Sequence, residues 1–294
     1  MVVTAFKLAP RSALLTVVAM LAFAANSLLC RLALGQGMID AASFASLRMI
    51  SGAVMLVAIV LLRRRKVRGS TATWRSASML FLYMACFSFA YLSLGAGTGA
   101  LILFGAVQLT MFVVALRGGE HFSGISWAGL ALAVLGLIYL VSPGLHAPDP
   151  WGALLMAVAG LAWGLYSLLG RRATDPLEAT ARNFVYAVPL VLLVSLAGWL
   201  VAPEAVLVTS RGVMLAIASG ALASGCGYVV WYAVLPSLPA TRAATVQLSV
   251  PALAALGGVL LLSEELTWRL VLATVATLGG VGLVLAQRAT RSTR

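Results

Sequence analysis

Charged residues are scarce in this 294-residue chain: Lys, Arg, Asp and Glu together make up 10% of it, whereas 62% is hydrophobic. Soluble domains average roughly 25% charged and about 45–50% apolar residues. A soluble fold of this length could not bury so much apolar surface. The composition therefore excludes a soluble domain and predicts that the chain is surrounded by lipid.

Cysteine and histidine are also rare, with three and two copies. Cys30, Cys86 and Cys226 fall in different apolar runs, and none belongs to a Cys-x-x-Cys or Cys/His cluster. His121 and His146 lie in loops or at helix ends. We therefore expect no disulfide, no metal site and no cofactor. A membrane-embedded enzyme would need a nucleophile with a histidine or aspartate partner, or a metal, within the membrane, so we predict that the protein is not an enzyme.

Ten apolar runs approach the length of about 20 residues that a helix needs to cross a bilayer. They are 13–34, 41–62, 74–95, 99–116, 124–142, 151–170, 180–201, 211–235, 242–262 and 267–286. The two-residue alternation of an outer-membrane barrel is not visible in the sequence. We predict an all-α membrane protein with ten transmembrane helices.

The second half of the chain repeats the first. Three segments recur downstream: 22–31 (AFAANSLLCR) as 162–171 (AWGLYSLLGR), 107–110 (VQLT) as 246–249 (VQLS), and 120–123 (EHFS) as 264–267 (EELT). The repeats, 13–142 and 151–286, hold five apolar runs each, and an odd number forces the second half to enter the membrane from the opposite side. Such inverted repeats are typical of transporters that hold a substrate between their halves.

The net charge of +12 is concentrated at the helix ends. A basic cluster follows the second run: Arg63, Arg64, Arg65, Lys66 and Arg68. Basic loops face the cytoplasm, so with ten spans both termini are predicted to be cytoplasmic, in the cell inner membrane. We interpret this charge as a signal for orientation and lipid contact, and we expect no nucleic-acid partner. The oligomeric state is left open.

None of the eight acidic residues lies near the middle of a run. Proton-coupled exporters of cations rely on a membrane-embedded carboxylate. Its absence from the sequence predicts a neutral, polar and aromatic cavity and favours facilitated diffusion. Arg48 and Arg182 occupy comparable places near the start of the second run of each half. We interpret both as interfacial, snorkelling or capping residues, in preference to a clamp for a substrate carboxylate.

Polar and aromatic residues within the runs are the candidate substrate-binding residues. They are Asn26, Tyr83, Tyr91, Gln108, Trp163, Tyr166, Tyr228, Trp231, Tyr232, Gln247 and Ser249. Aromatic faces can receive an ammonium group, and amides can hydrogen-bond both ends of a zwitterion. Hydrogen bonds between helices would satisfy the same polar groups equally well. Binding of a small molecule and a purely structural role therefore stay open for each residue.

The doubled pattern, the Glu-x-[Leu/Phe]-[Ser/Thr] that closes each fourth run and the ten runs together resemble the drug/metabolite transporter superfamily in its EamA-type branch. The resemblance covers essentially the whole chain and is greatest to the YddG-type amino-acid exporters. It implies export of small neutral or zwitterionic metabolites, amino acids including aromatic ones, by alternating access. The alternatives are export of lipophilic drugs or quaternary cations and, in another class, a passive channel or scramblase.

Overall fold

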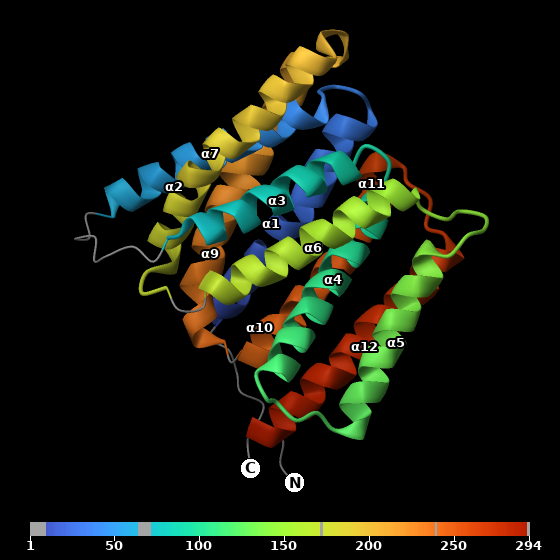
Figure 1. Cartoon of the computed structure of the whole chain (residues 1–294). Helices are drawn as coiled ribbons and strands as arrows, with labels where there is room; N and C mark the ends of the chain where they lie inside the picture. Colours follow the sequence, from blue (N-terminus) through green and yellow to red (C-terminus); the bar gives the residue numbers. More distant parts are fainter. Residues whose placement is uncertain (1–9, 64–71, 171–172, 239, 293–294) are drawn as a thin grey trace.

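The computed structural model describes residues 10–63, 72–170, 173–238 and 240–292, which form a bundle of helices (Figure 1). The first half contains α1 (Pro10–Gly35), α2 (Ala41–Leu62), α3 (Trp74–Ala90), α4 (Ala96–Arg117) and α5 (Gly124–Val141). The second half contains α6 (Pro150–Gly170), α7 (Pro176–Val201), α8 (Ser210–Ile217), the π-helical segment η2 (Ala218–Cys226), α9 (Gly227–Val234), α10 (Ala240–Gln247), α11 (Ser249–Leu262) and α12 (Trp268–Ser292).

Nine helical stretches within these described ranges are long and apolar enough to cross a bilayer. One is composite and contains α8, η2 and α9, and another joins α10 to α11. The helix α3 has 17 residues, or about 26 Å, slightly less than the roughly 30 Å of a hydrocarbon core. The all-α, multi-pass membrane fold is confirmed, while the count of ten spans stays a prediction.

Short polar residues fix where several helices begin. The carboxylate of Asp40 accepts a hydrogen bond from the Ser43 amide at 2.9 Å, at the start of α2. Asp175 does the same for the amides of Leu177 and Glu178, and Pro176 follows it at the first helical position. These caps satisfy amides that a helix start leaves without partners. The run predicted at 180–201 therefore begins four residues earlier.

One predicted run is wrong in detail: the run 74–95 ends as a helix at Ala90, and a turn leads from there to α4. The run predicted at 211–235 forms one helical stretch, Ser210–Ser237. Its middle part is the π-helical segment η2, whose small residues allow close helix contact. The wider π-helical turn is common at functional sites. A single hydropathy run cannot show either feature, because apolar residues of all sizes contribute to it equally.

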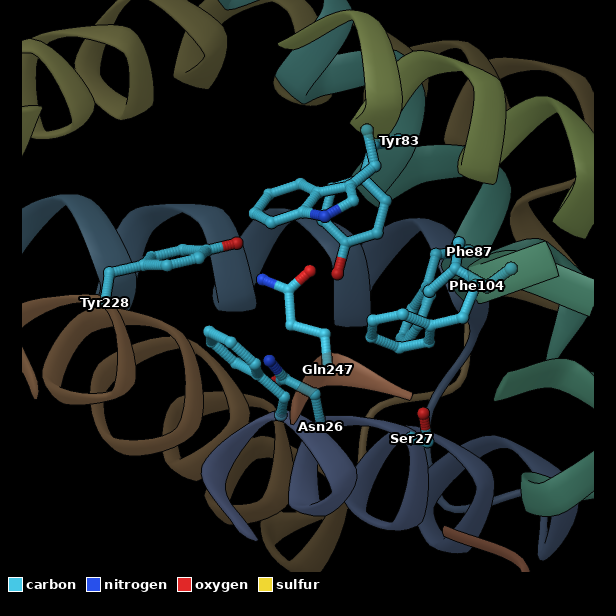
Figure 2. A pocket seen from close by; sticks show the side chains of 10 residues that line it. Asn26, Ser27, Tyr83, Phe87, Phe104, Tyr228 and Gln247 are labelled. Atoms are coloured by element: carbon cyan, nitrogen blue, oxygen red, sulfur yellow. The ribbon is translucent and has the colours of Figure 1, made fainter. Parts of the chain in front are cut away.

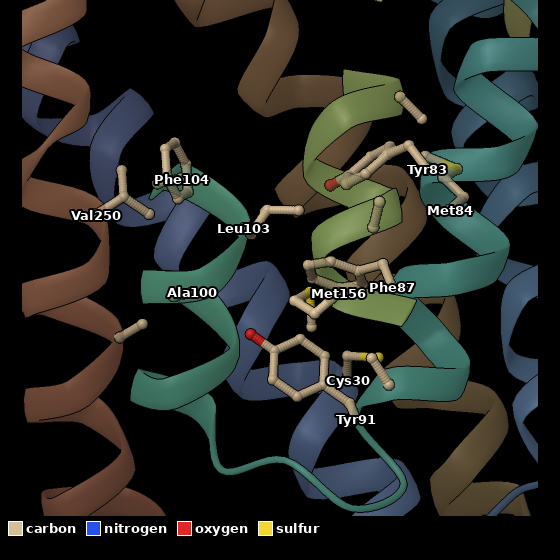
Figure 3. Packing of buried hydrophobic residues seen from close by; sticks show 14 of the residues in the cluster. Cys30, Tyr83, Met84, Phe87, Tyr91, Ala100, Leu103, Phe104, Met156 and Val250 are labelled. Atoms are coloured by element: carbon tan, nitrogen blue, oxygen red, sulfur yellow. The ribbon is translucent and has the colours of Figure 1, made fainter. Parts of the chain in front are cut away.

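Contacts between the halves organise the bundle: α2 packs on α7, α4 on α11 and α5 on α12. Figure 1 shows α5 and α12 side by side at one edge of the bundle. Nearer the centre, α3 and α4 pack on α6, while α1 packs on η2, α9 and α11. Figure 3 shows Cys30 of α1, Phe87 and Tyr91 of the α3 region and Met156 of α6 meeting in one buried cluster. This core supports one side of the candidate site.

Candidate functional site

A small cavity lies where helices from both halves meet (Figure 2). Its lining comes from α1, α3, α4, α6, α9 and α10. The ten lining residues are Phe23, Asn26, Ser27, Tyr83, Phe87, Leu103, Phe104, Trp163, Tyr228 and Gln247. The cavity volume is about 20 Å³, room for about one water molecule. Any larger molecule requires the surrounding side chains to move.

The structure brings five of the predicted residues to this cavity: Asn26, Tyr83, Trp163, Tyr228 and Gln247. They come from five different helices, so only the folded chain places them together. Figure 2 shows the amide of Gln247 and the hydroxyl groups of Tyr83 and Tyr228 directed at the same space. Polar groups that converge in an apolar pocket are the usual arrangement of a small-molecule site.

Trp163 is at the centre of a chain of aromatic contacts. Its ring stacks on Tyr228 with centroids 5.5 Å apart and an interplanar angle of 20°. The ring of Tyr83 lies 4.9 Å away on another side, and that of Tyr166 lies at 5.5 Å. Tyr83 in turn meets the edge of Phe87 at 5.5 Å. One wall of the cavity is therefore aromatic and continuous across α3, α6 and α9.

Asn26 lines the cavity but is already engaged in hydrogen bonds. Its Oδ1 accepts from the Ser219 hydroxyl at 2.8 Å, and its Nδ2 donates to the Ser224 hydroxyl at 3.2 Å. Both serines belong to η2, so Asn26 ties α1 to the π-helical segment. A buried amide needs such partners.

Three of the predicted residues lie around the cavity without lining it. The Tyr166 hydroxyl donates to Thr180 Oγ1 at 3.2 Å, and the Thr180 and Tyr232 hydroxyls are 3.1 Å apart. This chain of hydroxyl groups connects α6, α7 and α9. The rings of Trp231 and Phe23 meet edge to face with centroids 5.9 Å apart, and of the two only Phe23 lines the cavity. These contacts fit a supporting role.

The remaining three predicted residues also lie elsewhere. The Tyr91 hydroxyl donates to the Ala96 carbonyl at 3.3 Å, within the turn between α3 and α4. Ser249 is exposed, and its hydroxyl donates to the Val246 carbonyl at 2.7 Å. Gln108 is buried on α4, and its Nε2 has no hydrogen-bond partner within the described residues. The structure does not bring any of the three to the cavity.

The interpretation of Arg48 as an interfacial, snorkelling residue is wrong. Its side chain is fully buried instead of snorkelling, and its Nη2 donates to the Tyr83 hydroxyl at 3.1 Å. The guanidinium carbon lies 4.6 Å from the centroid of the Phe87 ring. One positive charge therefore lies beside the otherwise neutral cavity. It belongs to Arg48, which α3 covers, although its position in the sequence predicts a place near the membrane interface. Arg182, in contrast, is partly exposed and forms an ion pair with Glu178 at 2.8 Å.

Sequence reasoning missed the apolar part of the lining. Phe23, Phe87, Leu103 and Phe104 look like any other lipid-facing or core residue in an apolar run. The one available signal was spacing, since Phe87 follows Tyr83 by one helical turn and shares its face.

Comparison with known proteins identifies the family of this chain. Residues 150–286 match the EamA-like transporter family. The uncharacterized protein PA1977 of Pseudomonas aeruginosa is 53% identical and spans 97% of this chain and 98% of its own length. The uncharacterized transporter YoaV of Bacillus subtilis is 24% identical and covers 81% of this chain and 85% of its own. The chain belongs to the EamA-like transporter family. The predicted EamA-type branch is thereby confirmed.

This EamA-like protein is a multi-pass membrane transporter, and one relative is named as an inner membrane transporter. The uncharacterized inner membrane transporter YedA of Escherichia coli is 25% identical over 47% of this chain and 46% of its own length. A crystal structure with 18% identity covers 94% of this chain and 98% of its own, with a TM-score of 0.65. At that identity the likeness shows the shared fold.

Proposed function

We propose that this EamA-like transporter exports small neutral or zwitterionic metabolites, amino acids including aromatic ones, by alternating access. The observation that carries the proposal is the convergence of Gln247, Tyr83 and Tyr228 on a central cavity beside the aromatic surface of Trp163. Aromatic rings can receive both an aromatic side chain and an ammonium group. A Gln amide can donate to a carboxylate and accept from an amine. This is the function of a YddG-type exporter.

The packing supports an inverted repeat of five helices in each half. Exchanging the halves leaves the pairs α2–α7, α4–α11 and α5–α12 in place. The same exchange replaces the contact of α3 with α6 by that of α8, η2 and α9 with α1. It also replaces the contact of α4 with α6 by that of α11 with α1. This two-fold relation pairs α3 with the composite span of α8, η2 and α9, so it requires α3 to be the tenth transmembrane span. The repeats 13–142 and 151–286 would then rock about the cavity, which lies between them.

Export of quaternary cations or lipophilic drugs is the second candidate, because the aromatic wall would suit them too. None of the ten lining residues carries a charge, and the charge behind them, on Arg48, is positive. A cation would therefore meet repulsion without a compensating carboxylate. This distribution of charge favours a zwitterion.

Uptake into proteoliposomes tests the proposal. The panel is phenylalanine, leucine, a quaternary ammonium ion and a sugar phosphate, each with and without a pH gradient. We expect saturable uptake of the amino acids, without uphill concentration by the gradient. Replacing Trp163 with Leu should lower phenylalanine uptake about tenfold or more, because it removes the central aromatic contact surface.

The matched control is Trp268→Leu, since Trp268 is 79% exposed at the start of α12. Its uptake should equal that of the unaltered protein. Cation uptake driven by a proton gradient, with no amino-acid uptake, would contradict the proposed substrate class. Non-saturable uptake would instead indicate a channel.

The predicted topology needs its own test. Of the basic cluster after the second run, Arg63 caps the end of α2, and the other four residues lie outside the described ranges. With both termini cytoplasmic, green fluorescent protein fused after Arg294 should fluoresce, and alkaline phosphatase fused there should be inactive. Active phosphatase would mean an odd number of spans or a reversed orientation.

A further inference from the structure

Arg48 carries a buried positive charge that has no carboxylate partner among the described residues. Its side chain is inaccessible to solvent, and its Nε and Nη1 atoms have no hydrogen-bond partner among the described residues. The two ion pairs within the described part of the chain are Arg31–Glu264 and Arg182–Glu178, and neither includes it. An unpaired charge within a membrane protein is costly and marks a functional group.

Tyr83 connects this charge to the cavity. Arg48 Nη2 donates to the Tyr83 oxygen at 3.1 Å, so that oxygen acts as an acceptor and its own proton stays available for another partner. Figure 2 shows the hydroxyl directed into the cavity near Gln247. The rings of Tyr83 and Phe87 line the cavity and lie beside the guanidinium group. The cation is thus separated from the cavity by a single layer of side chains.

We propose that the Tyr83 hydroxyl donates a hydrogen bond to a carboxylate on the substrate, and that Arg48 is the positioning residue that makes the site selective for that carboxylate. A hydroxyl that accepts a bond from a cation becomes a stronger donor. The positive charge also attracts an anion in a dry site far more than it would in water. The inference rests on the proposed function and specifies which end of the substrate Tyr83 receives.

Arg182, which lies at a comparable place near the start of α7, argues against a role of Arg48 in folding alone. Arg182 has a carboxylate partner, Glu178 Oε1, at 2.8 Å, and 42% of its side chain is exposed. A structural requirement shared by both halves would be met in the same way in each. Of these two arginines, Arg48 is the one without a carboxylate partner among the described residues.

The charge balance selects a carboxylate over a phosphate ester. One guanidinium group compensates one negative charge, and the ten lining residues add no further cation. A phosphate monoester carries close to two negative charges at neutral pH, so one would stay uncompensated. The aromatic wall also suits an organic acid with an apolar side chain.

Binding to the purified full-length chain in lipid nanodiscs tests the inference, with tryptophan fluorescence as the readout. The ligands are phenylalanine and 3-phenylpropionate, which carry a carboxylate, and phenylalaninamide and phenethylamine, which do not. We expect the unaltered protein to bind the carboxylates about tenfold to a hundredfold more tightly, the range for a hydrogen bond to a charged group. Equal binding of both pairs, or no binding of any ligand, would overturn the inference.

Substitutions then separate selectivity from structure. Arg48→Met and Tyr83→Phe should reduce the carboxylate preference to near unity, Arg48→Lys should keep part of it, and the control Arg182→Met should keep all of it. A merely structural role would weaken all four ligands equally and preserve the preference, which would refute the inference. If Arg48→Met fails to fold, Tyr83→Phe decides, because it keeps the arginine and removes one hydroxyl.

The two proposals fail in different ways. Saturable amino-acid uptake combined with an unchanged carboxylate preference in Tyr83→Phe would overturn the role of Arg48 and Tyr83 alone. Uptake of quaternary cations without any uptake of amino acids would overturn the proposed function as well.

Discussion

Replacing Gly220 with Val is expected to prevent this transporter from folding, and Gly220→Ala to lower its melting temperature sharply. A Cβ atom at Gly220 would overlap the backbone carbonyl oxygen of Arg48 and the hydroxyl of Ser51, both on α2. A backbone oxygen cannot move aside without displacing the helix. Overpacking costs about 1–3 kcal/mol even where side chains can adjust. Thermal unfolding in detergent, followed by intrinsic fluorescence, measures the effect.

Gly279 provides the matched control. It also lies within a helix, α12, but a Cβ atom there would meet open space. Gly279→Ala should therefore leave the melting temperature unchanged or raise it slightly, because Ala favours a helix by about 1 kcal/mol over Gly. A similar fall for both variants would show that the contact between η2 and α2 is not the cause.

Replacing Glu264 with Ala is expected to expose Cys30 to thiol reagents. The Glu264 carboxylate accepts hydrogen bonds from Arg31 Nε at 3.2 Å and from the Ala96 amide at 2.9 and 3.0 Å. The same arginine donates through Nη1 to the carbonyl of Tyr91 at 3.2 Å. One carboxylate thus joins the end of α1, the start of α4 and the segment after α11. In the proposed alternating access, these contacts break when the end of the bundle that holds Arg31 and Glu264 opens.

Cys30 precedes Arg31 and is fully buried, so its labelling rate reports that opening. With Cys86→Ala and Cys226→Ala as background, Glu264→Ala should raise the rate of maleimide labelling about tenfold, since hydrogen bonds to a charged group are lost. Partial exposure of Arg31 and Glu264 limits the effect to about this size. The neighbouring Glu265 is exposed, so Glu265→Ala should label at the unaltered rate. Equal rates in both variants would contradict a closing role for Glu264.

The sequence predicts the helices well because the order of the residues shows directly how long each apolar run is. It does not predict how each helix is rotated, since lipid is as apolar as the core and both faces of a span look alike. Tyr83 and Tyr91 were equally good candidates for this reason, yet Tyr83 faces the cavity and Tyr91 closes a turn.

Arg48 shows a second limit of the sequence. Its position, eight residues into α2, fits an interfacial arginine, and only the packing of α3, α7 and η2 against α2 reveals that it is buried. The π-helical geometry of η2 is equally hidden, because Ser, Gly and Ala are as compatible with an ordinary α-helix. Both features depend on contacts between elements that are distant in the chain.

The tightness of the central cavity has a consequence for the energetics of the cell membrane. A space that holds about one water molecule cannot contain a file of water along which protons hop, so this cavity, in the form that the structure describes, offers protons no continuous path. A substrate must first separate aromatic side chains such as Trp163 and Tyr228, which are stacked on each other. Its measured affinity then includes the free energy of that opening, so weak apparent binding is compatible with strict selectivity.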